Sequence, residues 1–356
     1  MRKYFHFLTL ALVAATAFAS AAATGANAQT ARRRAAGAQQ TATTTAGAQA
    51  AATTAGVLAA LPTSDAVMLV DVRRLLSEGL PRAYHNNPAE LARVNSEIDK
   101  FKATTGLDAR SFERVAVGVS YVQTPTGKTL VETVAVARGR FNAATLVAAA
   151  RPAVNNRMTE EKYAGKTIYV FNVDTQVKLL GLFNARLSDV AFTALDANTI
   201  AVGKLERVRA SIDANAGRGR VSPDITALAT RDATALVGAG GNIPAWLTQN
   251  LDIGGGNLSQ SIASVRQFYG TLATTAGGFS LLTALRTENA GAAKTLSSTL
   301  TGLKSLAPFA IGQLPAPRAR PLQSLVENTK VGTEGNDVLI TLQLAQVDVA
   351  ALLDAF

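Results

Sequence analysis

Residues 264–296 read SVRQFYGTLATTAGGFSLLTALRTENAGAAKTL, and residues 112–146 read FERVAVGVSYVQTPTGKTLVETVAVARGRFNAATL. In both stretches an alternating apolar run meets a turn that contains glycine, and a second run ends in arginine and leads into an Ala-rich amphipathic segment. Alternation with a period of two is typical of a half-buried strand, so each stretch predicts a β-hairpin followed by a helix. This repetition concerns the fold, and it names no ligand or reaction.

The elements around the two hairpins also follow one order. Short apolar runs at 66–72 and 233–237 predict a strand that opens each half, and a helix is expected after each. We therefore expect two related half-domains, residues 58–216 and 224–356. The alternative is that the repetition is only the similarity of element order found within any α+β chain. Because hairpins outnumber crossovers, the expected fold class is α+β, with largely antiparallel sheet and helices packed on one face. Whether the halves share one sheet is left open.

Two further stretches, rich in glycine or proline, are interpreted as irregular structure. Gly238-Ala239-Gly240-Gly241 lacks the small residue at position 243 that a dinucleotide fingerprint needs, and it predicts a tight turn with positive φ. Residues 308–321, PFAIGQLPAPRARP, predict a loop because proline interrupts helices.

The N-terminus has the pattern of a signal peptide. Arg2 and Lys3 precede an apolar segment, and Ala26-Asn27-Ala28 forms the small-x-small pattern of a cleavage site before Gln29. The expected signal peptide is therefore 1–28, with cleavage between Ala28 and Gln29, and the expected location is periplasmic or secreted. Cleavage after Ala21 and retention as a membrane anchor are the alternatives. After cleavage no transmembrane segment is expected.

Residues 29–57 contain mainly Ala, Thr, Gln and Gly, with Arg32, Arg33 and Arg34 as the only charged residues. Such a composition offers little apolar surface to offset the entropy lost on ordering, so a disordered linker is predicted. The formal charge of the whole chain is +10, but basic residues are spread among acidic ones and no dense basic face is evident. A nucleic-acid partner is therefore not expected.

The usual catalytic residues are scarce. The chain has no cysteine, and its two histidines are His6, in the leader, and His85, in the segment YHNNP. No Gly-x-Ser-x-Gly motif supplies a nucleophile, and the two Gly-Lys-Thr tripeptides lead into predicted strands rather than helices. No catalytic residue, metal site or cofactor is predicted, and the chain is interpreted as leaning towards a non-enzyme.

Four carboxylates near predicted strand ends could still form an acid–base pair, as in glycosidases. They are Asp65, Asp71, Glu132 and Glu288. Spacing alone does not show that any two face each other. Asp71 lies in an apolar run and needs a partner, which Arg73 or Arg74 could supply.

Pairs of arginines recur at element ends or in loops. Arg138 and Arg140 follow the first hairpin, and Arg218 and Arg220 lie near the boundary between the halves. Guanidinium groups bind carboxylate and phosphate, so these four residues are the candidate anion-binding residues. Solvated loop charge is the alternative interpretation.

The stretches LPTSDAVMLVDVRRLLSEGLP and FKATTGLDARSFERVAVGV resemble exported bacterial proteins of unknown function, over about residues 58–215. The resemblance implies export and carries no assigned activity or site residue. The sequence thus favours an exported, non-enzymatic binding or structural protein of the cell envelope, with an unknown protein or envelope component as partner. A carboxylate-dependent hydrolase and a carrier of an apolar ligand are the alternatives.

Overall fold

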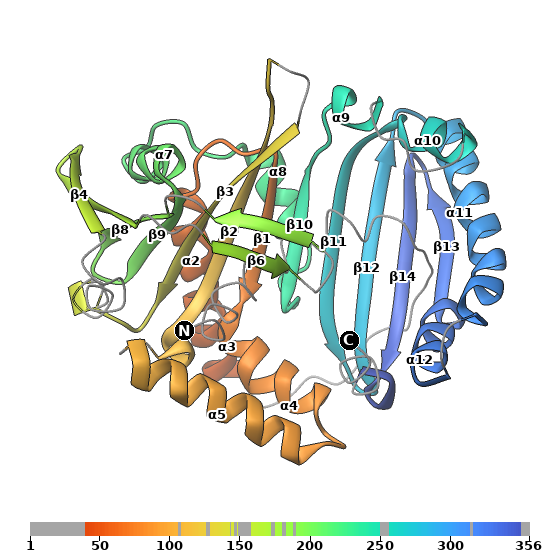
Figure 1. Ribbon diagram of the computed structural model, residues 1–356, viewed down its shortest axis with the longest axis horizontal. Helices are drawn as coiled ribbons and strands as arrows, with labels where there is room; N and C mark the ends of the chain where they lie inside the picture. The colour runs from red at the N-terminus through yellow and green to blue at the C-terminus, as the bar shows by residue number, and fades with distance from the viewer. Residues whose placement is uncertain are drawn as a thin grey trace.

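The computed structural model shows an α+β protein built around one large antiparallel sheet (Figure 1). The structure describes residues 40–356 except 106–107, 126–128, 143, 146–147, 149–157, 172–174, 180–182, 188–189, 250–255, 314–315 and 350–356. The predicted signal peptide and its cleavage site at Ala28–Gln29 lie outside these residues.

Within the described residues, twelve strands form the sheet in the order β13-β14-β12-β11-β10-β1-β2-β3-β9-β8-β5-β4. A separate two-stranded ribbon consists of β6 (Thr175–Leu179) and β7 (Phe183–Leu187). The sheet strands in chain order are β1 (Ala66–Asp71), β2 (Phe112–Gln123), β3 (Thr129–Gly139), β4 (Met158–Tyr163), β5 (Lys166–Phe171), β8 (Val190–Asp196), β9 (Thr199–Lys204), β10 (Val237–Asn242), β11 (Val265–Thr275), β12 (Gly278–Thr287), β13 (Thr329–Glu334) and β14 (Asp337–Ala345).

The two halves of the chain meet at the antiparallel pair of β1 and β10, where Met68 lies opposite Ala239. Read outward from this pair, the order is β1-β2-β3-β9-β8-β5-β4 on one side and β10-β11-β12-β14-β13 on the other. Each side therefore has an opening strand, a hairpin, and a second hairpin whose later strand joins the first. The question of a shared sheet is answered, since both halves contribute to one sheet.

Helices are the second component of the fold. In chain order they are α2 (Gln40–Ala59), α3 (Val72–Arg74), the π-helical turn η1 (Leu75–Gly79), α4 (Leu80–Ala83), α5 (Pro88–Thr105), the 3₁₀ turn η2 (Ala109–Ser111), α7 (Leu205–Asn215), α8 (Pro223–Ala229), α9 (Ala245–Gln249), α10 (Gly256–Ile262), α11 (Ala290–Ile311) and α12 (Ala316–Glu327). A side chain caps the N-terminus of α5, because the backbone N–H of Glu90 donates to Asn87 Oδ1 at 3.2 Å.

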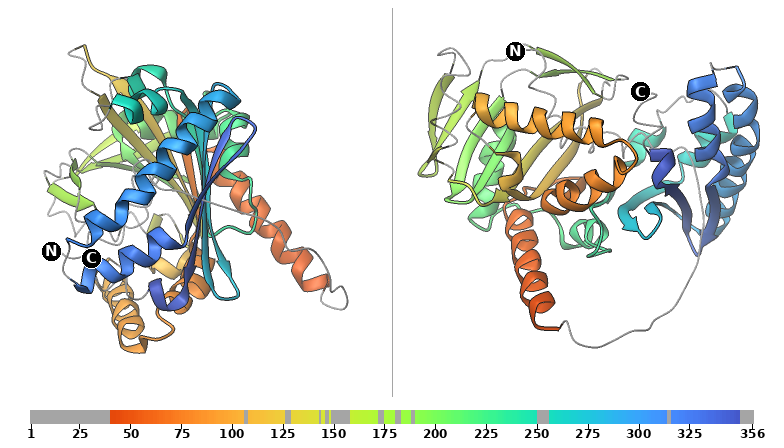
Figure 2. Two further views of the ribbon diagram at one scale, coloured as in Figure 1. Left: turned by 90° about the vertical axis from the view of Figure 1, so that its right-hand side faces the viewer. Right: turned by 90° about the horizontal axis from the view of Figure 1, so that it is seen from below.

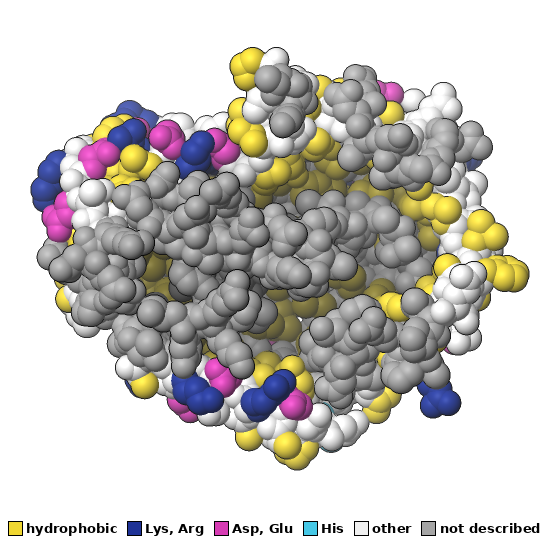
Figure 3. All heavy atoms as spheres, in the orientation of Figure 1, with side chains coloured by type: hydrophobic (Ala, Val, Ile, Leu, Met, Phe, Trp, Pro, Cys, Tyr) yellow, Lys and Arg dark blue, Asp and Glu magenta, His cyan; other side chains and the backbone are white. Residues whose placement is uncertain are grey.

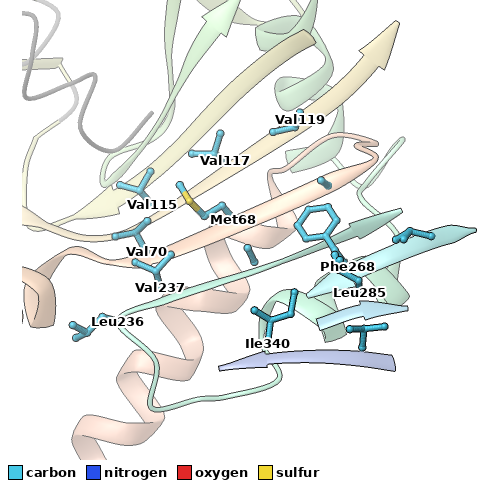
Figure 4. Close-up of a cluster of buried hydrophobic side chains, with 14 of the residues drawn as sticks. Met68, Val70, Val115, Val117, Val119, Leu236, Val237, Phe268, Leu285 and Ile340 are labelled. Carbon is cyan, nitrogen blue, oxygen red and sulfur yellow. The ribbon is translucent and has the colours of Figure 1, made fainter. Parts of the chain in front are cut away.

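One face of the sheet, the front face, carries the larger hydrophobic core. Met68 and Val70 of β1 share this face with Phe268, Leu285 and Ile340 from the second half (Figure 4). Helix α11 covers part of it with Ala293, Leu296 and Leu300. This core crosses the seam between β1 and β10, so the two halves are held together by buried apolar surface as well as by the strand pairing.

The opposite face, the back face, has its own core. Val67 and Leu69 point to this side because neighbouring side chains in a strand alternate. Val57 of α2, Val208 of α7 and Ile225 of α8 pack against it. In the edge-on view of Figure 2, α11 and α12 lie on one side of the sheet and α2 projects from the other. The α+β class and the antiparallel sheet are confirmed, but helices cover both faces, not one as we expected.

The expected disordered linker over 29–57 is wrong from residue 40 onward, where α2 begins. Alanine has the highest helix propensity of the natural residues, and the small side chains let the end of α2 approach the sheet closely. Thr53 is 6% exposed and Val57 is fully buried. The composition of residues 29–57 predicted disorder because the few residues that pack against the sheet, such as Thr53 and Val57, lie at the end of this segment.

The predicted turn at Gly238–Gly241 is also wrong, since these residues lie inside β10 and none of them has positive φ. A Cβ on Gly238 would stand 2.1 Å from the carbonyl oxygen of Ala229, and one on Gly240 would stand 2.3 Å from Leu228 Cβ. The glycines therefore allow α8 to pack directly on the strand. The opening strand predicted at 233–237 instead begins at Val237, after a turn at residues 233–234.

The predicted loop at 308–321 is largely helical. Pro308 lies inside α11 and Pro321 inside α12. Most of the helix predicted after the first hairpin, including residues 146–147 and 149–157, lies outside the described residues. Its N-cap is described, and Asn142 Oδ1 accepts the backbone N–H of Ala144 at 2.9 Å.

Candidate functional site

A polar pocket lies where α2 meets the end of β3 on the back face. Its cavity volume is about 270 Å³. We call it the arginine pocket, and it is lined by Gln49, Ala52, Thr53, Glu113, Arg138, Gly139, Arg140 and Asn198. It contains one of the two arginine pairs singled out in the sequence, Arg138 and Arg140, together with polar residues from three separate parts of the chain.

Arg138 is held between α2 and the turn that joins β8 to β9. Its Nη1 donates to Thr199 Oγ1 at 3.2 Å and lies 3.6 Å from Asp196 Oδ2. A Cβ on Gly56 of α2 would stand 3.1 Å from this Nη1. The glycine thus leaves room for the guanidinium group against the helix, and α2 forms one wall of the pocket.

Arg140 lies beside an acidic residue. Its Nε is 3.6 Å from Glu113 Oε1, and the Arg140 side chain is 72% exposed whereas that of Glu113 is 13% exposed. Thr53 Oγ1 lies 3.4 Å from Glu113 Oε2 and 2.8 Å from the carbonyl oxygen of Gln49. The pocket therefore combines two guanidinium groups with one carboxylate that is largely shielded from solvent.

The backbone between the two arginines is closely fixed. Gly139 N–H donates to the carbonyl oxygen of Asn198 at 3.1 Å, and Asn198 Nδ2 donates to the carbonyl oxygens of Gly139 and Phe141 at 3.3 and 3.1 Å. A Cβ at position 139 would stand 2.2 Å from the carbonyl oxygen of Ser111. These contacts anchor the residues on either side of Gly139, which carry the two guanidinium groups.

The second arginine pair is not part of this pocket. Arg218 forms an ion pair with Asp213 of α7, and Arg220 Nε donates to the carbonyl oxygen of Ala214 at 2.8 Å. Both residues lie in the connection between α7 and α8. Their donors serve the end of α7, which is a structural role.

Two of the four carboxylates lie at opposite ends of β1. Asp71 Oδ2 is 2.9 Å from Arg114 Nη2, and Asp71 Oδ1 accepts the backbone N–H of Arg74 at 3.0 Å. The expected guanidinium partner, Arg73 or Arg74, is therefore wrong. Asp65 Oδ2 accepts the backbone N–H of Tyr121 at 2.8 Å. Six residue steps of about 3.3 Å place the backbones of Asp65 and Asp71 about 20 Å apart, too far for a shared substrate bond.

The other two carboxylates have cationic partners. Glu132 Oε1 lies 2.6 Å from Lys204 Nζ, and Glu288 pairs with Arg266. Arg207 interacts with the charges of both Glu132 and Asp65. Burial lowers the pKa of Arg207, whereas these two carboxylates act in the opposite direction. Each of the four carboxylates thus faces a cation or a backbone donor.

His85 is exposed, and its Nδ1 lies 2.9 Å from the side-chain oxygen of its neighbour Asn86. Among the described residues, no three His, Asp or Glu side chains come together as metal ligands would. In the same part of the chain, no helix is both long and apolar enough to cross a lipid bilayer.

The sequence identified Arg138 and Arg140 but missed Gln49, Thr53, Glu113 and Asn198. Asn198 lies in a polar turn, and Glu113 lies two residues before Val115, where the alternation of β2 begins. Neither position has a pattern of its own. The α2 residues lie in the segment that composition had assigned to a linker.

The known proteins that are similar to this chain are distant structural neighbours. No protein-family model matches the chain, and no curated protein sequence matches it. Crystal forms III and I of TP0453 are similar to it with TM-scores of 0.45 and 0.42 and with 15% and 14% sequence identity. Each alignment covers 84% of this chain, and 98% and 96% of the TP0453 chains respectively. Likeness at this level carries no argument about function.

Proposed function

We propose that the chain is an exported, non-enzymatic binding protein that receives a small anionic group in the arginine pocket. The observation that carries the proposal is the pair of guanidinium groups, Arg138 and Arg140, on either side of a fixed glycine at the mouth of a polar cavity. Guanidinium groups in a fixed position bind carboxylate with two donors each. A component of the cell envelope with an exposed carboxylate would suit this chemistry.

Binding is favoured over turnover by what surrounds the two arginines. Thr53, Gln49 and Asn198 are neutral hydrogen-bonding groups, and Thr53 Oγ1 and Asn198 Nδ2 contact backbone carbonyl oxygens. General acid–base catalysis needs a group that exchanges a proton near neutral pH and reaches the substrate. Glu113 is the one carboxylate among the residues that line the pocket, so no second carboxylate is present there to act with it as an acid–base pair.

The experiment is a calorimetric titration of the purified chain with a small carboxylate, N-acetylserine. We expect binding that is lost in the double variant R138A/R140A and kept in the matched control R218A/R220A. Both variants remove two arginines, so a nonspecific effect of net charge would appear in both. Equal binding by wild type and R138A/R140A, or no binding at all, would refute the proposal.

Export is tested separately, by expressing the chain with residues 1–28 and measuring the mass of the product by mass spectrometry. A mature protein that begins at Gln29 is the expected result. A product that retains residues 1–28 would contradict the cleavage that the proposal assumes.

One observation favours a second candidate, a carrier of an apolar molecule. On the face shown in Figure 3, hydrophobic side chains gather towards the middle, whereas charged ones lie near the margins. Apolar ligands bind where apolar side chains line a concave surface. Saturable binding of a fluorescent fatty acid by the purified chain, unaffected by R138A/R140A, would support this candidate. Absence of saturation would exclude it.

A further inference from the structure

Glu113 distinguishes the arginine pocket from a simple anion site. A carboxylate in the wall repels an incoming anion, and the repulsion is stronger where water is partly excluded. Glu113 is 13% exposed, and its Oε1 lies only 3.6 Å from Arg140 Nε. A ligand that carries negative charge alone would meet both an attraction and a repulsion here.

We propose that the arginine pocket binds a free amino acid as a zwitterion, which rests on the function proposed above. The ligand carboxylate lies between Arg138 and Arg140, and its ammonium group lies against Glu113. A zwitterion satisfies both signs of charge in the pocket, which an anion or a cation alone does not. Gln49 and Asn198 line the same cavity and supply amide groups for the remaining polar atoms.

The ion pairs within the pocket leave room for such a ligand. The nitrogen–oxygen separations of Arg138 to Asp196 and of Arg140 to Glu113 are both 3.6 Å. Charge-assisted hydrogen bonds between such groups are typically about 2.7–2.9 Å long. Both pairs are looser than that, so a ligand can form shorter contacts without first breaking a tight one.

Size and lining narrow the class of amino acid. A cavity of about 270 Å³ lies just below the usual range for drug-sized ligands, about 300–1,000 Å³. Among the lining residues only Ala52 and Gly139 have no polar side chain, and none has a large apolar or aromatic side chain. The geometry therefore favours amino acids with small polar side chains, of which serine is the probe we choose.

The test compares three probes that differ in one charge each: serine, N-acetylserine without the ammonium, and serine amide without the carboxylate. Calorimetry on the full purified chain is expected to give measurable binding of N-acetylserine, as the proposed function requires, and at least tenfold tighter binding for serine than for either analogue. The variant E113Q, which keeps the shape of Glu113 without its charge, should reduce the affinity for serine to that for N-acetylserine. R218A/R220A should leave the affinity for serine unchanged.

The outcomes separate this inference from the proposed function. Equal affinity for serine and N-acetylserine in the wild type overturns the zwitterion and leaves an anion pocket. Failure of all three probes to bind overturns both. An unchanged preference for serine in E113Q overturns the role of Glu113, provided that the circular dichroism spectrum and thermal midpoint of E113Q match those of the wild type.

Discussion

Asp71 and Arg114 lie directly opposite each other on β1 and β2, and Asp71 Oδ2 is 2.9 Å from Arg114 Nη2. Their side chains are only 2% and 11% exposed, which makes this an ion pair inside the protein. The attraction of such a pair is largely offset by the cost of removing both charges from water. The consequence of removing one partner is much larger, since the other charge is then buried alone.

The substitution D71N tests this imbalance. It keeps the shape of the side chain but leaves the guanidinium group of Arg114 unpaired, and we expect the free energy of unfolding to fall by about 3–5 kcal/mol. Urea denaturation followed by circular dichroism measures the change. The double variant D71N/R114M should recover a substantial part of the loss, because no buried charge remains. A change below about 0.5 kcal/mol in D71N would show that the pair is not buried as described.

Gly240 provides a second test, on the packing of α8 against β10. A Cβ at this position would stand 2.3 Å from Leu228 Cβ and 2.9 Å from the carbonyl carbon of Leu228. We expect G240A to lower the free energy of unfolding by about 1–3 kcal/mol, through displacement of the helix backbone.

Gly302 is the matched control, because it lies in α11 and a Cβ there meets no atom within 4 Å. G302A should raise the stability by up to about 1 kcal/mol, since alanine favours helix more than glycine does. Thermal unfolding of both variants would show shifts of opposite sign. Shifts of the same sign would contradict the packing role assigned to Gly240.

The strands with clear alternation could be predicted closely. The strand predicted at 66–72 corresponds to β1, and the hairpins predicted within 112–146 and 264–296 correspond to β2–β3 and β11–β12. The errors have one physical origin, because local patterns do not reveal tertiary contacts. In the sequence Gly238 and Gly240 indicate a turn, but in the structure they allow α8 to pack on β10. Pro308 indicates a loop, but it lies within α11. The edge strand β4, with the polar sequence MTEEKY, has no apolar alternation to reveal it.

The candidate site was predictable only in part. Arg138 and Arg140 can be recognised from the sequence alone, because two arginines are separated by a single glycine. Their neighbour Glu113 comes near because β2 pairs with β3, and Thr53 comes near because α2 docks across the end of both strands. Neither long-range contact leaves a local signal. The charge balance that led to a zwitterionic ligand could therefore not be inferred before the fold was known.

Tyr269 gives the protein a pH dependence at the alkaline end. Its side chain is 4% exposed, and its hydroxyl donates to Asp337 Oδ2 at 3.0 Å. Burial, followed by the charge of Asp337, raises the pKa of Tyr269 to about 12. The cation of Arg231, 4.5 Å from the ring centroid, acts in the opposite direction.

Because this pKa is raised above the value of about 10 in the unfolded chain, the contribution of Tyr269 to stability is fully present below pH 10. It is lost as the pH rises from about 10 to about 12, and its full size is about 3 kcal/mol. We expect the free energy of unfolding to fall more steeply over this range in the wild type than in Y269F, as urea titrations at several pH values would show. Parallel slopes for the two proteins would contradict the assignment.

The docked end of α2 is tested by Val57, which is fully buried between the helix and the back face of the sheet. V57A removes two buried methyl groups and leaves a cavity, so the free energy of unfolding should fall by about 2 kcal/mol. The exposed Ala55 lies on the outer side of the same helix, and A55S should change the stability by no more than about 0.5 kcal/mol. A free linker would show no effect in either variant. A loss confined to V57A would instead mean that this part of the segment belongs to the folded body, and with it the α2 wall of the arginine pocket.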